Sequence, residues 1–90
     1  MPEFPNLVFS DEFFLSFADR TFGAADRRAI LKALELLNRD ASHPSLRVHA
    51  LRGELAGSWS ASVTASIRIE FVRDPEARLR LRRCSRHYDR

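Results

Sequence analysis

The sequence predicts an α+β domain in which a helical hairpin covers one face of an antiparallel sheet. Apolar side chains recur at helical spacing through residues 11–39, whereas apolar and polar side chains alternate with a period of two from Val48 onward. Turn-forming residues divide this second part into three or four strands. We expect residues 1–90 to form a single domain, because neither a repeat nor a linker divides them.

The first half of the chain predicts a short strand and two helices. The apolar run Leu7–Phe9 predicts the strand, and Ser10 followed by two acidic residues marks a helix start. Phenylalanines at helical spacing extend this helix from about Asp11 to Thr21. Gly23 interrupts the pattern, and a second helix is expected from about Ala24 to Arg39, antiparallel to the first.

The second half predicts strands with one apolar and one polar face. Residues 40–46 form a loop, and residues 54–57, 64–66 and 74–76 form turns. The core face is expected to carry Trp59, Ala61, Val63, Ile67, Ile69, Phe71, Leu79 and Leu81. The opposite face is expected to carry Arg68, Glu70, Arg78, Arg80 and Arg82. This phase places Trp59 in the core, beneath the helices.

The composition excludes several classes of protein. Hydrophobic residues make up 44% of the chain and charged residues 30%, which is typical of globular domains rather than collagen-like or disordered chains. The apolar runs are far shorter than the ~20 residues of a membrane span, and the N-terminus lacks the pattern of a secretory signal. The single cysteine, Cys84, excludes an internal disulfide. We therefore expect a cytoplasmic protein with no membrane partner.

The charge is distributed unevenly along the chain. Up to Ser45 there are 5 basic and 7 acidic residues, whereas the rest of the chain has 10 basic and 5 acidic residues. This asymmetry predicts one face suited to a polyanion or to an acidic protein partner. The alternative is a charged sheet face that only contacts water. The preference for 14 arginines over one lysine fits phosphate recognition, but a GC-rich genome would also produce it.

The C-terminal segment, residues 82–90, is the richest in reactive side chains. Metal-free cleavage of RNA needs a base, a cation to stabilise the phosphorane, an acid and a group that holds the nucleotide in line. His87 could act as base or acid and Tyr88 could stack on a nucleobase, while arginines bind phosphate. The alternatives are a charged tail and a Cys84–His87 nucleophilic pair. The histidine spacing predicts no metal site, and no cofactor motif is present.

Several short motifs follow one another in a recognisable order. They are His49-Ala50-Leu51-Arg52-Gly53, Ser58-Trp59-Ser60, Ile67-Arg68-Ile69-Glu70-Phe71 with Arg68 nine residues after Trp59, and Cys84-Ser85-Arg86-His87-Tyr88. Together they resemble the RelE/ParE superfamily of bacterial toxins, and most closely the YoeB- and YafQ-like mRNA interferases. The resemblance implies a RelE-like fold, with an N-terminal strand and helical hairpin on a twisted antiparallel sheet of about four or five strands.

The resemblance also implies a function and a set of site residues. The protein would be the toxin of a type II toxin–antitoxin system, of the kind linked to plasmid stabilisation. It would be an endoribonuclease that cleaves mRNA on the 70S ribosome without a metal or cofactor. Arg68 would bind the scissile phosphate, His87 would be the general acid and Tyr88 would orient the substrate. RNA or phosphate binding would fall to Arg47, Arg52, Arg80, Arg82 and Arg86.

Some positions depart from the family pattern and keep alternatives open. Ser45 stands near the place of the glutamate base of YoeB-like toxins, so His49 or His43 would have to act as the base. A ParE-like toxin that binds DNA gyrase, or an inactive relative that binds only an antitoxin, are the other interpretations. His87 and Tyr88 favour the nuclease. A cognate antitoxin is expected to lay an acidic segment over the arginine-rich surface, in a hetero-oligomer or beside a toxin homodimer.

Overall fold

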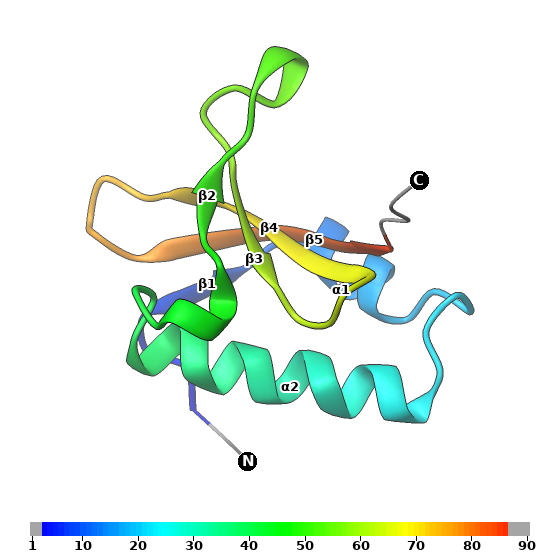
Figure 1. The fold of residues 1–90 in the computed structure, drawn as a ribbon. Helices are drawn as coiled ribbons and strands as arrows, with labels where there is room; N and C mark the ends of the chain where they lie inside the picture. The colour runs from blue at the N-terminus through cyan, green and yellow to red at the C-terminus, as the bar shows by residue number, and fades with distance from the viewer. Residues whose placement is uncertain (1–2, 87–90) are drawn as a thin grey trace.

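The computed structural model describes residues 3–86, and Figure 1 shows their fold. The elements, in chain order, are β1 (Leu7–Phe9), α1 (Asp11–Phe17), α2 (Ala24–Arg39), β2 (His49–Ala50), β3 (Trp59–Ser62), β4 (Ile67–Arg73) and β5 (Leu79–Arg86). Short 3-10 turns, Pro44–Leu46 and Gly53–Leu55, flank β2. The predicted α+β class and the predicted order of strand, two helices and strands are confirmed.

The five strands form one sheet in the order β1-β5-β4-β3-β2. Strands β2 to β5 pair antiparallel through successive turns, but β1 runs parallel to β5, with Leu7 opposite Leu79. The sheet is therefore mixed, and the expectation of a purely antiparallel sheet was wrong. A hairpin turn dictates an antiparallel pair, whereas both helices and three strands separate β1 from β5.

Helix α1 begins as predicted but ends earlier. The side chain of Ser10 accepts a hydrogen bond from the backbone N–H of Phe13 and so caps the helix. The helix ends at Phe17 rather than Thr21, because Asp19 forms a turn whose carbonyl accepts from the N–H of Phe22. Phe22 is buried in the core from this loop and not from a continuing helix.

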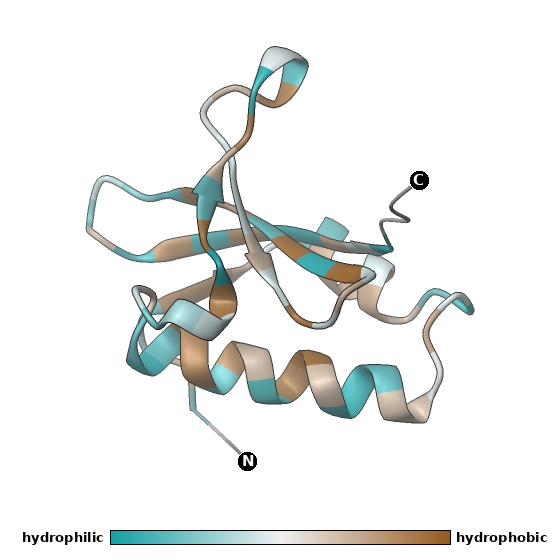
Figure 2. Ribbon diagram, in the orientation of Figure 1, coloured by the Kyte–Doolittle hydropathy of each residue, from teal (hydrophilic) through white to brown (hydrophobic). Residues whose placement is uncertain are grey.

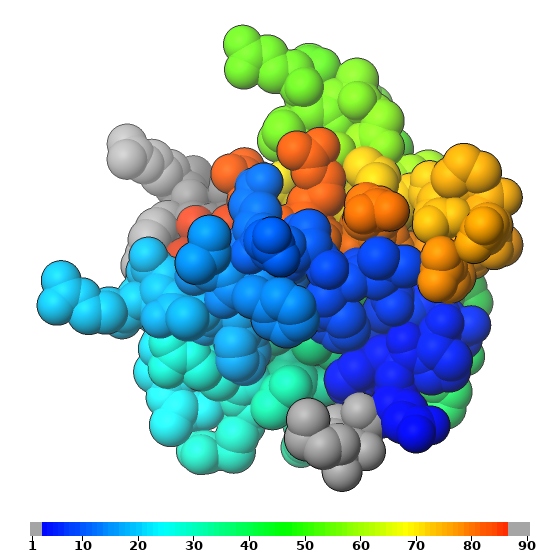
Figure 3. Space-filling view, turned by 180° about the vertical axis from the view of Figure 1, so that it is seen from behind, coloured from blue at the N-terminus to red at the C-terminus, as the bar shows by residue number. Residues whose placement is uncertain are grey.

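Helix α1 covers the part of β5 that β1 does not reach. The Oγ of Ser10 donates to the carbonyl of Arg82 at 3.3 Å, and the N–H of Cys84 donates to the Oγ of Ser16 at 3.0 Å. Figure 3 shows the blue N-terminal segment against the orange β5 on this side of the molecule. The side chains of the N-cap Ser10 and of Ser16 in α1 thus satisfy backbone groups of β5 beyond the end of β1.

Helix α2 has the predicted bounds and buries its predicted apolar face. The chain turns back after α1, and α2 then runs along the sheet (Figure 1), with brown and teal residues alternating along it (Figure 2). Ile30, Leu34 and Leu37 are buried against the inward side chains of β4 and β5. At the start of the helix, the Nε of Arg27 donates to the carbonyl of Phe17 at 2.8 Å and so fastens α2 to α1.

Trp59 lies at the margin of the core and not within it. Its strand phase is as predicted, because its neighbour Ala61 is fully buried and Phe71 stands opposite it. However, Trp59 itself is only partly buried, beside the two-residue strand β2. The guanidinium of Arg73 covers its ring, with 5.1 Å between the guanidinium carbon and the ring centroid.

A bulge in β5 changes the phase of its side chains. Leu81 pairs with Phe71 and Arg83 pairs with Glu70, so Arg82 has no partner of its own on β4. The predicted alternation therefore holds only as far as Arg82. Beyond the bulge, Arg83 faces away from the helices and Cys84 is buried.

Candidate functional site

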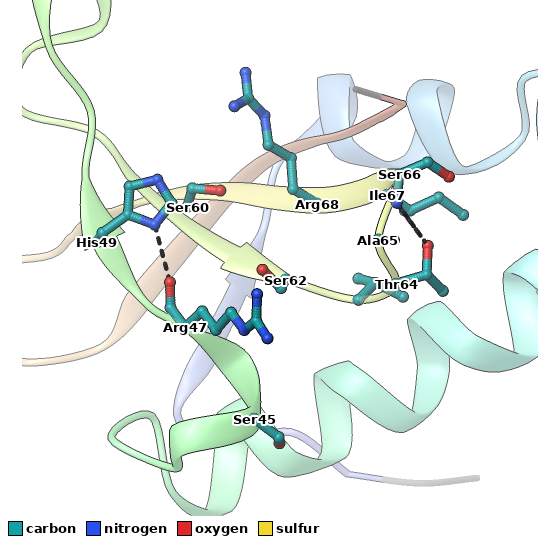
Figure 4. Close-up of a pocket in the computed structure, with 11 residues that line it drawn as sticks. Ser45, Arg47, His49, Ser60, Ser62, Thr64, Ala65, Ser66, Ile67 and Arg68 are labelled. Atoms are coloured by element: carbon teal, nitrogen blue, oxygen red, sulfur yellow. Dashed lines mark hydrogen bonds between the residues drawn. The ribbon is translucent and has the colours of Figure 1, made fainter. Parts of the chain in front are cut away.

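The sheet face opposite the helices, called here the open face, carries a pocket of about 550 Å³. Figure 4 shows this pocket between the edge strand β2, the β3–β4 turn and the first half of β4. It is lined by Ser45, Arg47, His49, Ser60, Ser62, Val63, Thr64, Ala65, Ser66, Ile67 and Arg68. None of these lining residues is acidic, so the two arginines make the lining positively charged.

Arg68 lies on β4 at the wall of the pocket. Its neighbours Ile67 and Ile69 are buried on the helix side, so the alternation of the strand turns Arg68 to the open face. The side chain is 26% exposed, and Figure 4 shows its guanidinium extending away from the sheet. Its Nε is buried and meets no hydrogen-bond acceptor within residues 3–86. Because no such hydrogen bond holds it, the guanidinium of Arg68 can bind an anionic ligand without losing an internal hydrogen bond.

His49 and Arg47 enter the pocket from the β2 side. The Nδ1 of His49 lies 2.9 Å from the carbonyl oxygen of Arg47. Because a carbonyl can only accept, Nδ1 carries the proton, and in the neutral ring Nε2 is left with a lone pair. The exposed His49 side chain therefore has the tautomer that a general base requires.

The backbone conformation of Arg47, just before β2, is strained. Arg47 follows the turn Pro44–Leu46 with a φ of 46°, in the left-handed region that residues other than glycine rarely adopt. Its N–H donates to the carbonyl of Pro44 at 3.2 Å, which closes the turn. Ser45, on the same turn, is tied to His43, whose Nδ1 lies 2.8 Å from the Ser45 Oγ. His43 does not line this pocket.

Glu70 is a central residue of the open face that sequence reasoning left without a role. It is only 3% exposed, although it faces away from the helices. Its Oε2 accepts from the Nε of Arg83 at 3.1 Å and from the Oγ of Ser85 at 3.2 Å. The Nε of Arg68 lies 3.8 Å from the same oxygen. A lone acid among alternating arginines was the signal that could have revealed this cluster.

Arg86 reaches the rim of the pocket, but its donors are already occupied. Its guanidinium donates to Asp26 at 2.8 Å, to the carbonyl of Thr21 at 2.9 Å and to the Oγ of Ser66 at 3.2 Å. It also lies over the ring of Phe22, 5.5 Å from the centroid. The backbone N–H of Gly23 and the charge of Arg86 hold the pKa of Asp26 below its usual range. These contacts tie β5 to the start of α2 and leave Arg86 little capacity for phosphate.

The remaining predicted site residues either do not line the pocket or lie outside residues 3–86. Arg80 and Arg82 are exposed on β5, and Arg52 is exposed after β2, but none of the three lines the pocket. His87 and Tyr88 lie outside the described residues.

Two negative findings apply to the described part of the chain. Within residues 3–86, no three histidine, cysteine, aspartate or glutamate side chains come together as metal ligands. In the same range, no helix has the length and apolar character to cross a membrane.

Comparison with known proteins identifies structural relatives. No protein-family model matches the sequence, and no curated protein is similar to it. A YoeB/ParE toxin from Agrobacterium tumefaciens superposes with a TM-score of 0.70 at 22% identity, over 92% of this chain and 99% of that chain. The toxin–antitoxin complex RelBE2 from Mycobacterium tuberculosis contains a chain with a TM-score of 0.71 at 19% identity, over 91% and 96% of the two chains.

A third solved structure agrees with the first two. YafQ from E. coli has a TM-score of 0.70 at 15% identity, over 89% of this chain and 90% of that chain. In all three cases the match covers nearly the whole of both chains, so the helices and the sheet correspond as one unit. The chain therefore shares the fold of the YoeB/ParE toxin, of the matching chain of the RelBE2 complex and of YafQ.

Proposed function

We propose that this protein is the toxin of a type II toxin–antitoxin system and that it cleaves mRNA on the ribosome. The observation that carries the proposal is Arg68, whose Nε meets no hydrogen-bond acceptor within residues 3–86, in a pocket that also holds His49 and Arg47. A cation and a potential base in one open, positively charged pocket suit a phosphodiester. The fold shared with YoeB-, RelE- and YafQ-type toxins supports the same conclusion.

In the proposed reaction, the ribose 2′-hydroxyl attacks the neighbouring phosphorus atom. The Nε2 of His49 accepts the hydroxyl proton, since no carboxylate lines the pocket to do so. Arg68 stabilises the charge that develops on the phosphorane oxygens. His87 protonates the departing 5′-oxygen, and Tyr88 orients the nucleotide; both roles rest on the sequence motif. The products are a 2′,3′-cyclic phosphate and a free 5′-hydroxyl.

The cognate antitoxin is proposed to bind the arginine-rich surface. After Ser45 the chain holds 10 basic and 5 acidic residues, and the exposed arginines of β5 belong to this part. An acidic segment would associate rapidly with such a surface, and salt would weaken the association. The RelBE2 structure is a complex of toxin and antitoxin, which supports a partner of this kind.

A translating extract provides the test. Wild-type protein should cut a defined mRNA, as detected by primer extension, and an Arg68→Ala variant should not. Arg28→Ala is the matched control, because Arg28 is exposed on α2 away from the pocket. On naked RNA that the protein cuts, EDTA should leave the rate unchanged, and deoxyribose at the scissile position should abolish cleavage.

Other outcomes would overturn the nuclease. Cleavage of the deoxyribose substrate, or strict dependence on Mg²⁺ with naked RNA, would contradict the mechanism. Intact mRNA together with inhibition of DNA supercoiling by gyrase would show the ParE-type function instead. If the protein neither cleaves mRNA nor arrests growth when it is expressed, it is an inactive relative that only binds an antitoxin.

A further inference from the structure

The cluster around Glu70 contains more positive charge than its internal contacts require. One buried carboxylate is flanked by two guanidiniums, those of Arg68 and Arg83, and by the hydroxyl of Ser85. A buried carboxylate is costly unless charged and hydrogen-bonding groups surround it. Glu70 therefore has a structural reason to keep both arginines close. The two arginines together leave one positive charge that this carboxylate does not neutralise.

The geometry of the contacts leaves the outer ends of both arginines available. Each guanidinium approaches the same oxygen, Glu70 Oε2, through its Nε atom, at 3.1 Å for Arg83 and 3.8 Å for Arg68. The terminal nitrogens of these two side chains make no hydrogen bond within residues 3–86. Arg83 is 44% exposed and Arg68 is 26% exposed. Two fixed guanidiniums with free terminal donors are an arrangement suited to phosphate oxygens.

The bulge in β5 is what brings Arg83 to this position. Because Arg82 is the extra residue, Arg83 stands directly opposite Glu70, and Ser85 stands opposite Arg68. With uninterrupted alternation from Leu79 and Leu81, Arg83 would have pointed toward the helices. The chain thus departs from regular strand geometry at the point where a second arginine joins the open face.

We propose that Arg83 is a second phosphate-binding residue and that Glu70 is the positioning residue that holds Arg68 and Arg83 as a pair. This proposal rests on the proposed function and extends it to a second backbone phosphate of single-stranded RNA. Arg68 contacts the scissile phosphate, and Arg83, one strand further across the open face, contacts an adjacent one. Glu70 does not touch the RNA and acts through the two arginines.

The sign of the Glu70 effect separates positioning from simple electrostatics. Removing a negative charge beneath a phosphate site should by itself leave RNA binding unchanged or strengthen it. Loss of positioning should lower the rate of the chemical step, because a displacement of about 1 Å can cost about 100-fold in rate. Glu70→Gln should therefore lower kcat by about 10- to 100-fold without raising KM. A purely structural defect would instead reduce the amount of active protein and the melting temperature.

The experiment combines cleavage with an independent measurement of binding. The binding probe is a short single-stranded RNA with deoxyribose at the scissile position, followed by fluorescence anisotropy at several salt concentrations. Arg83→Ala should weaken binding and lower the salt slope by about 0.7, the value for one phosphate contact on a single strand. The matched controls are Arg28→Ala and Glu35→Gln, which change exposed residues of α2.

A double substitution tests whether Glu70 acts through its arginines. In an Arg68→Ala, Arg83→Ala background, Glu70→Gln should have no further effect on kcat, because the groups that it positions are absent. Circular dichroism and thermal unfolding select folded variants. If Glu70→Gln proves unfolded, Ser85→Ala removes one hydrogen bond to the same carboxylate and should lower kcat in the same direction, by less.

The outcomes distinguish this proposal from the proposed function. If the wild-type protein cleaves RNA but Arg83→Ala and Glu70→Gln behave like Arg28→Ala and Glu35→Gln, the arginine pair is refuted and the nuclease stands. If the wild-type protein cleaves nothing but Arg83→Ala still lowers the salt slope, the phosphate site stands and the nuclease is refuted. An equal effect of Glu70→Gln with and without the arginines would refute the positioning role.

Discussion

Arg68 lines the pocket and Arg86 bonds to the pocket residue Ser66, but the donors of these two arginines are bound to very different extents. Arg86, at the end of β5, donates to Asp26, to the carbonyl of Thr21 and to Ser66. Arg68, on the neighbouring strand β4, makes no hydrogen bond within residues 3–86 and approaches the carboxylate of Glu70 at 3.8 Å. Their exposed fractions differ little, at 19% and 26%. The number of unsatisfied donors, and not exposure, distinguishes an arginine that holds the fold together from one that can bind a ligand.

The same difference explains why the arginine-rich composition was ambiguous. Arginine supports packing at Phe22 and Trp59 through cation–π contacts and supports the fold at Asp26 through an ion pair. Other arginines stand on the open face, where their donors meet few partners. A count of basic residues includes both kinds. Substitutions that remove one kind at a time can therefore separate chemistry from stability.

The largest effect is expected from His87, the proposed general acid. His87→Ala should lower the turnover of RNA cleavage by about two to four orders of magnitude, the usual contribution of general acid catalysis. Binding of the deoxyribose-containing RNA should change little, because the arginines of the open face supply the phosphate contacts. Single-turnover cleavage beside anisotropy measures both quantities. Undiminished toxicity of this variant in cells would favour the gyrase-binding alternative.

Substitution of Arg68 should have the next largest effect on turnover, and it tests the comparison with Arg86 directly. Arg68→Ala should lower turnover by about 100- to 1000-fold, which is the cost of losing one donor to a developing oxyanion. Its melting temperature should fall only slightly, because Arg68 makes no hydrogen bond within residues 3–86 and the buried Glu70 keeps its hydrogen bonds from Arg83 and Ser85. If Arg68→Ala cleaves RNA at a rate close to that of Arg28→Ala, Arg68 has no role in the chemical step.

Arg86 should show the reverse pattern. Arg86→Ala breaks a charged hydrogen-bond network and should lower the free energy of unfolding by about 1–3 kcal/mol. Cleavage per folded molecule should be largely retained, since its donors are bound within the protein. Urea denaturation measures the first quantity, and turnover corrected for the folded fraction measures the second. A stable variant with greatly reduced turnover would place Arg86 among the substrate-binding residues.

The sequence predicted the local elements better than the contacts between them. Gly23 and the caps define α2 within the chain itself, and the apolar alternation of β4 is equally local. The parallel partner of β1 and the ion pair of Arg86 with Asp26 join residues more than fifty positions apart. No periodicity reports such pairings.

The candidate site shows the same division between local and distant information. Arg68 was placed on the open face by the alternation of β4, and His49 was named through the motif resemblance; the structure puts both in one pocket. Arg83 was missed because the bulge at Arg82 reverses the phase that the alternation predicts. Glu70 was placed on the correct face, but its burial depends on side chains from the neighbouring strand β5.

The smallest expected effect is a pH dependence of stability, which arises from the contacts of Asp26 with Gly23 and Arg86. The pKa of Asp26 is lowered, first by the hydrogen bond from the Gly23 backbone N–H and then by Arg86. The unfolded chain therefore binds this proton more readily than the folded chain does. The stabilisation is complete above ~pH 4, the usual range of a free aspartate, and is lost as the pH falls through the lower folded pKa.

Substitution of Asp26 tests whether its ionisation causes this pH dependence of stability. Asp26→Asn should unfold at a lower temperature than the wild type at about pH 6, and the two melting temperatures should converge as the pH falls below the lowered folded pKa of Asp26, where the wild-type carboxyl is protonated as well. Asp40, whose pKa is lowered by hydrogen bonds from Ser42, keeps some acid sensitivity in both proteins. Arg86→Ala should reduce the pH dependence only in part, because the Gly23 contact remains. A gap between the wild type and Asp26→Asn that stays constant with pH would show that the Asp26 network contributes packing and not charge.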